Sequence, residues 1–206
     1  MKNIAVFVSG GGSNLQSLIN ACKKGEIKGK ICAVISSKES AYALKRAAKA
    51  GIPCYVFEKK NYENTEEMFF NITKLLNSKK IDYIVLAGYL TVIPQSFIKI
   101  YKNRIINIHP SLIPSFCGMG FYGLKVHQSA IDYGVKLSGC TVHFVDENAD
   151  TGAIILQEAV EVKENDTAKT LQNRILEKEH ILLPKAVQLL TMGKIQIDGR
   201  KVIIKE

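Results

Sequence analysis

Short apolar runs alternate with amphipathic stretches over the first half of the chain. Buried parallel strands read as continuous apolar runs, and residues 4–8 (IAVFV) and 83–87 (YIVLA) have this pattern. The pattern predicts strands near residues 3–8, 30–36, 54–57, 83–87 and 105–108, and helices near residues 14–24, 42–50 and 63–79. Such alternation is typical of a parallel sheet covered by helices on both faces.

The regular alternation of predicted strands and helices ends near residue 110. A short helical pattern at residues 124–133 precedes two longer strands, at 135–145 and 154–162, that an irregular loop joins. A long amphipathic helix is expected at 167–190, starting at Asp166. Finally, an Asp-Gly turn signal marks a hairpin at residues 196–202.

Together these elements predict an α/β fold. We expect a Rossmann-like, mostly parallel twisted sheet with helices on both faces and a mixed or antiparallel C-terminal extension. The length of 206 residues and the 47% apolar content suit one domain over residues 1–206. Within it we expect a Rossmann-like half at residues 1–110 and a second half at 111–206.

Apolar runs and cysteine spacing limit the cellular locations and the kinds of disulfide or metal site to be expected. No stretch approaches the roughly 18 consecutive apolar residues of a membrane helix, and the N-terminus lacks the pattern of a signal peptide. A cytoplasmic protein with no membrane partner is therefore expected. The five cysteines contain no CxxC pair, and the chain has no HExxH motif, so we predict neither a disulfide framework nor a metal site.

The net charge of +9 favours anionic partners. The basic residues are scattered in short clusters, and the chain has no arginine-rich stripe of the kind that lines a nucleic-acid groove. We therefore expect small-molecule anions, such as phosphates or polycarboxylates, and no nucleic acid.

A glycine-rich turn, residues 9–15 (SGGGSNL), follows the first predicted strand and opens the first predicted helix. Bare backbone amides at a helix N-terminus form a ready anion site, and Ser13 and Asn14 add side-chain donors. The third glycine of a dinucleotide fingerprint is missing, as is the Gly-Lys pair of a Walker motif. Two interpretations stay open: a cradle for one phosphate, or a tight turn in which Ser13 caps the helix.

The most informative segment is residues 105–112 (IINIHPSL), where an apolar strand ends in polar groups and proline. Asn107 and His109 are two residues apart, so a strand directs their side chains to one face. Asp150 follows in a turn-forming sequence between apolar runs. An amide donor, an imidazole and a carboxylate suit acyl transfer without a covalent nucleophile.

In this interpretation Asn107 and His109 stabilise an oxyanion, and Asp150 accepts a proton. We expect Asp150 to hold the imidazole in its charged form, and we expect activity to fall at low pH as Asp150 protonates. Each residue also has a structural alternative: an Asx turn, a hydrogen-bonded core histidine or an ordinary turn aspartate. His143 alternates into the core and is interpreted as structural or as a supporting residue.

These residues resemble the folate-dependent N-formyltransferases. The matching segments are residues 9–15 (SGGGSNL), 86–89 (LAGY), 107–114 (NIHPSLIP), 141–145 (TVHFV) and 150–152 (DTG). They occur in the family's order over almost the whole chain. The serine-glycine opening is similar to the branch that formylates the amine of a phosphoribosyl glycinamide in purine biosynthesis.

The resemblance implies a reaction and a set of residue roles. A formyl group would pass from 10-formyltetrahydrofolate, a bound cosubstrate, to the glycinamide amine, and no metal would take part. The partners would be these small molecules only, and the protein would be a monomer or homodimer. The implied roles are catalysis for Asn107, His109 and Asp150; phosphate binding for Gly12, Ser13 and Asn14; glycinamide or ribose binding for Glu179; and folate binding for Leu90, Thr91, Val92, Ile93 and Asn107.

Other functions remain open. Formyltetrahydrofolate deformylase and the methionyl-tRNA and sugar-nucleotide formyltransferases share the same core, and a non-catalytic phosphate-binding module could hold the same residues in structural roles. The tRNA enzyme adds a C-terminal RNA-binding domain, whereas only 56 residues follow Asp150 here. Residues 115–123, with Cys117 where proline is common, form either a loop that folds over substrates or a plain surface loop.

Overall fold

The computed structural model describes residues 1–205 and divides into two compact units, Met1–Ile106 and Asn107–Glu206. Hydrogen bonding connects seven strands in the order β3-β2-β1-β4-β5-β6-β7, and a separate two-stranded sheet pairs β8 with β9. Strand β5 (Ile105–His109) begins in the first unit and ends in the second. The predicted fold class is thus confirmed, whereas the single domain over 1–206 stays a prediction.

The first unit is a parallel α/β layer structure. Its strands are β1 (Lys2–Val8), β2 (Gly29–Ser36), β3 (Cys54–Val56) and β4 (Tyr83–Leu86). β1 pairs in parallel with β2 and β4, and β2 pairs in parallel with β3. Five consecutive β1 residues, Ile4 to Val8, are buried, which is why the strand reads as an unbroken apolar run.

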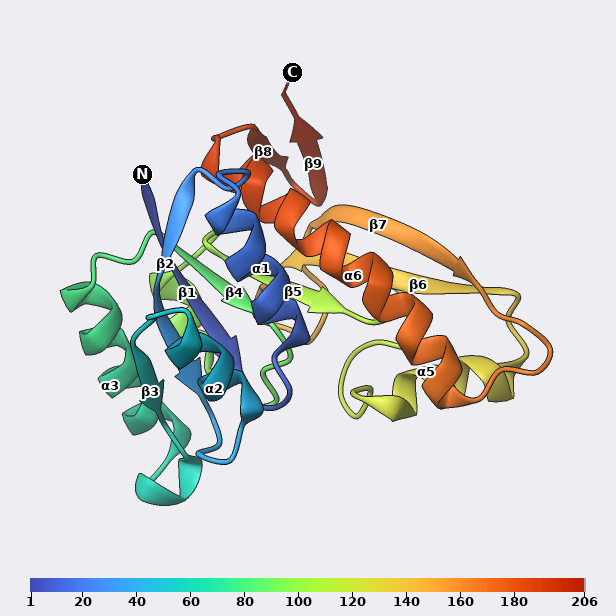
Figure 1. Cartoon of the computed structure of the whole chain (residues 1–206), viewed down its shortest axis with the longest axis horizontal. Coiled ribbons are helices and arrows are strands. Elements are labelled where there is room, and N and C mark those ends of the chain that lie inside the picture. Colours follow the sequence, from blue (N-terminus) through green and yellow to red (C-terminus); the bar gives the residue numbers. More distant parts are fainter. Residues whose placement is uncertain (206) are drawn as a thin grey trace. The chain divides into compact units, whose positions relative to one another are not determined.

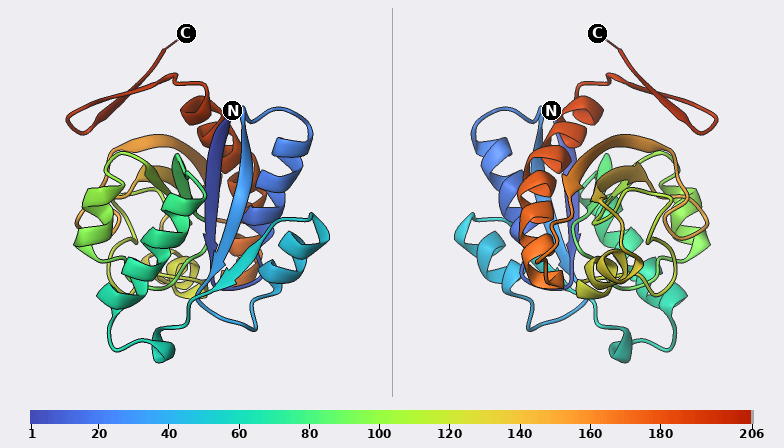
Figure 2. Two further views of the ribbon diagram at one scale, coloured as in Figure 1. Left: turned by 90° about the vertical axis from the view of Figure 1, so that its left-hand side faces the viewer. Right: turned by 90° about the vertical axis from the view of Figure 1, so that its right-hand side faces the viewer.

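Helices cover both faces of this unit. They are α1 (Ser13–Lys23), α2 (Tyr42–Lys49), the short 3₁₀ helix η1 (Lys59–Asn61), α3 (Thr65–Ser78) and α4 (Gln95–Ile100). α1 and α2 contact each other on one face of the strands, and α3 contacts α4 on the other (Figures 1 and 2). Both faces are apolar, so the four strands are enclosed as the alternating pattern predicts.

The second unit is a hairpin of long strands covered by a helix. β6 (Leu137–Phe144) and β7 (Ile154–Glu161) pair antiparallel, and α5 (Leu124–Tyr133) precedes them. α6 (Ala168–Thr191) packs on α5, β6 and β7, with buried residues such as Leu171 and Ile175 (Figure 1). β8 (Ile195–Asp198) and β9 (Lys201–Ile204) form the predicted hairpin.

The sequence pattern missed two short helices and misplaced one helix start. η1 spans three residues and α4 spans six, too few for a helical period to be visible. α6 begins after Thr167, whose side chain accepts the N–H of Thr170 in a capping box, and not at Asp166. The carboxylate of Asp166 instead accepts hydrogen bonds from Arg174, so it is not the cap. Among residues 1–205 no helix is both long and apolar enough to cross a membrane.

Candidate active site

Strand β5 carries the two donors of the predicted site. Ile106 and Ile108 are buried on one face of the strand, and the residues that alternate with them, Asn107 and His109, point to the opposite face. The His109 side chain is only 5% exposed. Pro110 then ends the ladder because it has no N–H to donate. Two polar side chains therefore leave the end of one buried strand in the same direction.

The acid comes from the loop between β6 and β7. This loop folds back tightly, since a Cβ at Gly152 would overlap with the carbonyl oxygen of Phe144. Asp150 adopts a left-handed backbone (φ 56°), a conformation that aspartate tolerates better than most residues. The Thr151 hydroxyl donates to the Asp146 carboxylate at 2.6 Å. These features aim the Asp150 carboxylate back toward β5.

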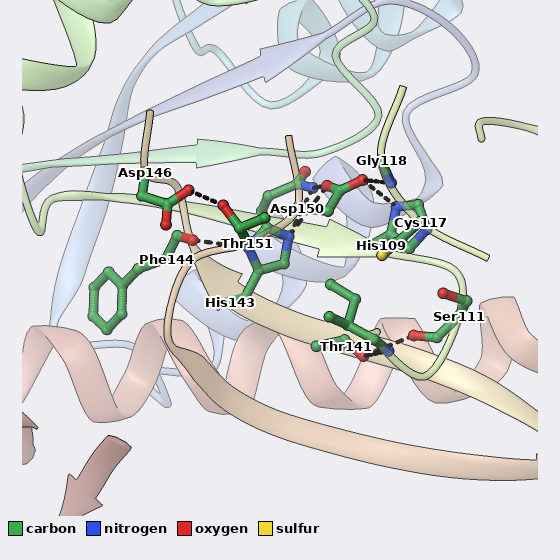
Figure 3. A network of polar contacts seen from close by, with 12 residues as sticks. His109, Ser111, Cys117, Gly118, Thr141, His143, Phe144, Asp146, Asp150 and Thr151 are labelled. Carbon is green, nitrogen blue, oxygen red and sulfur yellow. Dashed lines mark hydrogen bonds and ion pairs between the residues drawn. The ribbon is translucent and has the colours of Figure 1, made fainter. Parts of the chain in front are cut away.

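Asn107 and His109 both lie close to Asp150, and Figure 3 shows the His109 and Asp150 side chains of this cluster. His109 Nδ1 lies 3.5 Å from Asp150 Oδ2, and Asn107 Nδ2 lies 3.5 Å from Asp150 Oδ1. The second side of the carboxylate accepts the backbone N–H of Gly118 at 2.8 Å. An amide, an imidazole and a carboxylate from separate segments of the second unit thus share one location.

His143, on β6, belongs to the same cluster. Its Nδ1–H donates to the carbonyl of Phe144 at 2.8 Å, and its Nε2 lies 3.5 Å from Asp150 Oδ1 (Figure 3). The same Nε2 lies 3.2 Å from Asn107 Nδ2. In the neutral tautomer, Nε2 accepts from the Asn107 amide and so orients it. Sequence reasoning gave His143 a structural or supporting role; the structure places it in direct contact with two of the three site residues.

The charge state expected for His109 was wrong. Burial lowers the pKa of His109, and the attraction of Asp150 and the hydrogen bond to the Phe116 carbonyl oppose this only in part; His143 lowers the pKa further. The net pKa is below the usual histidine value, so the imidazole at rest is neutral near pH 7. Its Nε2–H donates to Phe116 at 3.0 Å, which leaves the Nδ1 lone pair facing Asp150.

Asp150 is ionised. Burial raises the pKa of its carboxyl group, but the polar surroundings provided by His143, His109 and the Gly118 N–H together outweigh burial and leave the pKa below its usual value. A carboxylate that is held charged beside a neutral imidazole can accept a proton and can stabilise an imidazolium as it forms.

The segment after β5 is fastened to β6. Thr141 Oγ1 donates to the Ser111 carbonyl at 2.7 Å (Figure 3). It also accepts the N–H of Ile113 at 3.1 Å. The Ser111 hydroxyl donates to the carbonyl of Ser115 at 2.6 Å. Cys117 is half-buried, and burial, followed by the nearby Asp150, raises the pKa of its thiol, so it stays protonated.

In the first unit, the glycine turn has the geometry of an anion cradle. Gly12, and not Ser13, is the N-cap of α1, because its left-handed backbone (φ 71°) brings it against α2, where a Cβ would lie 2.6 Å from Ala43 Cβ. The Gly10 carbonyl accepts the Ala43 N–H at 3.0 Å, and the Gly11 carbonyl accepts Arg46 Nε–H at 2.9 Å.

These bonds orient the N–H groups of the turn. In each peptide the N–H points opposite to the C=O, so the amides of Gly11 and Gly12 face away from α2. The capping role considered for Ser13 is therefore wrong, since Ser13 is the first helical residue. Asn14 is buried, and its carbonyl accepts the Ser17 hydroxyl at 2.8 Å.

The remaining predicted residues have different surroundings. Residues 87–94 of the first unit lie in neither a helix nor a strand, and the apolar side chains of Leu90 and Val92 are 54% and 66% exposed. Thr91 and Ile93 are half-buried. Glu179 on α6, in the second unit, is 5% exposed. Burial of Cys140, and after it the charge of the nearby Glu179, raises the pKa of the Cys140 thiol to about 12.

The structure therefore gathers the three predicted catalytic residues and adds His143 and the Gly118 amide. The predicted phosphate residues and the folate residues 90–93 belong to the first unit, whereas Asn107, which was also predicted to bind the folate, and Glu179 belong to the second. Alternation of residues along β6 gave a partial signal for His143, whereas a backbone N–H such as that of Gly118 has no signature in the sequence. Among residues 1–205, no group of His, Cys, Asp or Glu side chains is arranged to hold a metal ion.

Several known proteins are similar to this chain in sequence and in fold. A family model described as Formyl transferase matches residues 2–187. Phosphoribosylglycinamide formyltransferase of Haemophilus influenzae is 42% identical over 197 residues, which cover 96% of this chain and 91% of that protein. The chloroplastic phosphoribosylglycinamide formyltransferase of Vigna unguiculata is 42% identical over 194 residues, and the chain, 94% of it aligned, spans 62% of that longer protein.

Among solved structures, glycinamide ribonucleotide transformylase 1 from Symbiobacterium toebii matches with a TM-score of 0.95 at 39% identity. The match covers 100% of this chain and 95% of that one. The solved structure therefore has a counterpart for every segment that carries a site residue.

Proposed function

Because the chain belongs to the formyl transferase family, we propose that it transfers a formyl group from 10-formyltetrahydrofolate to the amine of 5-phosphoribosylglycinamide, in de novo purine biosynthesis. The observation that carries this proposal is the meeting of Asn107, His109 and Asp150, which supplies two donors and one proton acceptor at a single location. The full-length similarity to phosphoribosylglycinamide formyltransferases supports the choice of acceptor.

The proposed reaction is a direct attack. The amine nitrogen forms a bond to the formyl carbon, negative charge develops on the formyl oxygen, and the attacking nitrogen becomes cationic. The nitrogen then loses a proton, the bond from the formyl carbon to N10 of the folate breaks, and N10 takes up a proton. The protein must therefore stabilise an oxyanion and move one proton.

Asn107 and His109 are suited to the oxyanion. The Asn107 amide has two N–H groups, and the neutral His109 ring keeps one at Nε2, which donates to the Phe116 carbonyl. We infer that the formyl oxygen takes the place of this carbonyl. Donors of this kind typically lower a barrier by about 2.7 to 4 kcal/mol each.

Asp150 is suited to accept the proton that the attacking amine releases. It is ionised at neutral pH, and its Oδ2 lies 3.5 Å from His109 Nδ1, which holds a lone pair at rest. A proton taken from the amine can therefore be shared with Nδ1, producing an imidazolium beside a carboxylate. His109 then donates to the oxyanion with a full positive charge, at the moment when that charge is needed.

The binding roles follow the chemistry of each segment. The outward amides of the turn at Gly12, with Ser13 and Asn14, would hold the ribose phosphate. The exposed apolar segment Leu90, Thr91, Val92 and Ile93, with Asn107, would bind the folate, and Glu179 would bind the glycinamide or ribose. A cytoplasmic location, small molecules as the only partners and a monomeric or homodimeric state remain predictions.

The test is an assay of the purified chain with 10-formyltetrahydrofolate, with and without 5-phosphoribosylglycinamide. We expect release of tetrahydrofolate that depends on the amine, and its loss in the His109→Ala variant while ribose 5-phosphate still binds. Release without the amine would instead favour a deformylase, in which water takes the amine's place. No release under either condition would favour a phosphate-binding module and would refute the proposed activity.

A further inference from the structure

Ser9 stands at a branch point of the first unit. It follows strand β1 and is 5% exposed. Its Oγ lies 2.6 Å from Ser37 Oγ, at the end of β2, and accepts the backbone N–H of Leu90 at 2.9 Å. One buried hydroxyl therefore contacts the segments that follow three neighbouring strands, β1, β2 and β4.

Leu90 is the first residue of the segment to which the folate is assigned. Gly88, just before it, has a left-handed backbone (φ 77°), and the chain from 87 to 94 is in neither a helix nor a strand. The Leu90 N–H therefore cannot be satisfied by a strand ladder. The Ser9 hydroxyl satisfies it and so fixes the direction of the peptide that opens this segment.

On its other side, Ser9 begins the glycine turn. The next two carbonyls, those of Gly10 and Gly11, accept hydrogen bonds from Ala43 and Arg46. An anion held by the outward amides of this turn restricts the same backbone from which the Ser9 side chain projects. Ordering the turn therefore also orders the acceptor of the Leu90 N–H.

We propose that Ser9 is a positioning residue that couples the two binding segments, so that a phosphate at the glycine turn strengthens folate binding at residues 90–93. This inference rests on the proposed function for the identity of the two ligands. The coupling is reciprocal, because a ligand that fixes Leu90 also favours the ordered turn. Its size is that of one hydrogen bond, a change in affinity of about 2- to 10-fold.

The test measures the affinity of 5-formyltetrahydrofolate by titration calorimetry, with and without saturating ribose 5-phosphate. In the wild-type protein we expect ribose 5-phosphate to tighten folate binding by about 2- to 10-fold. In Ser9→Ala the folate affinity without phosphate falls by a similar factor, and the effect of phosphate disappears. In the transfer reaction this variant raises KM for the folate and leaves kcat nearly unchanged.

Two matched variants separate positioning from general damage to the fold. Ser37→Ala removes the neighbouring hydroxyl but leaves the acceptor of the Leu90 N–H, so it should keep both the folate affinity and the effect of phosphate. Ser9→Thr keeps a hydroxyl at the branch point and should restore much of the coupling that Ser9→Ala loses.

A second measurement does not need a folded variant. Amide hydrogen exchange at Leu90 in the wild-type protein should slow when ribose 5-phosphate binds, with no folate present. Equal exchange rates, or a Ser9→Ala protein with unchanged folate affinity and an intact effect of phosphate, would overturn the inference. A wild-type protein that does not bind folate would overturn the proposed function as well, whereas folate binding that ignores phosphate would overturn the coupling alone.

Discussion

Replacement of Asp150 by asparagine removes one negative charge and almost no volume. The carboxylate lies 3.5 Å from His109 Nδ1 and 3.5 Å from His143 Nε2, and it accepts the Gly118 N–H at 2.8 Å. An asparagine oxygen can still accept from Gly118, so the loop keeps this contact. The variant loses the proton acceptor and the counter-charge for the His109 imidazolium.

The distance between His109 Nδ1 and Asp150 Oδ2 determines how large a loss of kcat we expect. At an effective dielectric constant of about 20, two unit charges 3.5 Å apart attract each other by about 5 kcal/mol. Both side chains are mostly buried, so solvent screens this attraction only weakly. Loss of most of this energy in the transition state corresponds to a fall in kcat of roughly 10²- to 10⁴-fold. KM should change little, because the imidazolium forms only during the reaction.

The assay is a single-turnover measurement of formyl transfer at saturating substrates, near pH 7.5. Asp146→Asn is the control: Asp146 lies in the same loop, and its carboxylate accepts the Thr151 hydroxyl and the Asn148 N–H, both within that loop. We expect the control to keep kcat within about threefold. If Asp150→Asn loses less than tenfold while remaining folded, neither proton transfer to Asp150 nor its charge on His109 limits the reaction.

Three further predictions test the charge states and the glycines. His127 on α5 is 1% exposed, and burial lowers its pKa to about 4. Between pH 4 and the pKa of about 6.5 that a histidine has in an unfolded chain, the unfolded protein therefore binds a proton at His127 more readily than the folded protein does. The free energy of unfolding should therefore fall as the pH falls through this window. We expect the fall to be larger in wild type than in His127→Gln by up to about 3 kcal/mol, measured by denaturant titrations at pH 7 and 4.5. Equal pH dependence would contradict this. Gly12→Ala should weaken binding of ribose 5-phosphate about tenfold or more in calorimetry, because φ is 71° and Ala43 is too close, whereas Gly10→Ala, whose Cβ would meet no described atom within 4 Å, should not. Gly152→Ala should lower the free energy of unfolding by roughly 2 to 4 kcal/mol and reduce kcat, since its Cβ overlaps with the Phe144 carbonyl; near-wild-type stability would show that the turn can move without cost.

Low pH also tests Asp150. Since its carboxyl pKa lies below the usual value near 4, the loss of activity expected from its protonation belongs below about pH 4, and not between pH 5 and 8. An acid limb in kcat near pH 6 would therefore report another group, and its persistence in Asp150→Asn at reduced kcat would identify it as such.

The main elements of the fold follow from the apolar runs. Residues 4–8 of β1 and 84–86 of β4 are buried, so these runs contain no polar residue. α5 was located to the residue because its apolar positions recur with a helical period. α4 could not be found this way: it has six residues after Pro94 and is held by the burial of Phe97 and Ile98, which depends on tertiary packing. Its sequence alone contains less than two turns of periodic signal.

For the site, strand alternation was enough to bring Asn107 and His109 together, since two residues apart on a strand share a face. The approach of Asp150 depends on a loop whose path is set by Gly152 and by the left-handed backbone of Asp150 itself. A sequence shows that these residues permit such a turn, but not toward which strand it folds. His143 reaches Asn107 because β6 lies next to β5 in the sheet, whereas its proximity to Asp150 depends on that turn.

The direction of the His109 pKa shift depends on burial of the ring, which cannot be judged from the sequence. A carboxylate neighbour raises the pKa of a histidine, and this is all that the sequence could suggest; burial of the ring lowers the pKa, and here burial is the larger effect. The two effects have different consequences for catalysis. A permanently charged His109 would cost folding energy in a buried site. A neutral ring beside an ionised Asp150 avoids this cost at rest and gains its charge only when the amine releases a proton, so the electrostatic stabilisation acts on the transition state and not on the ground state.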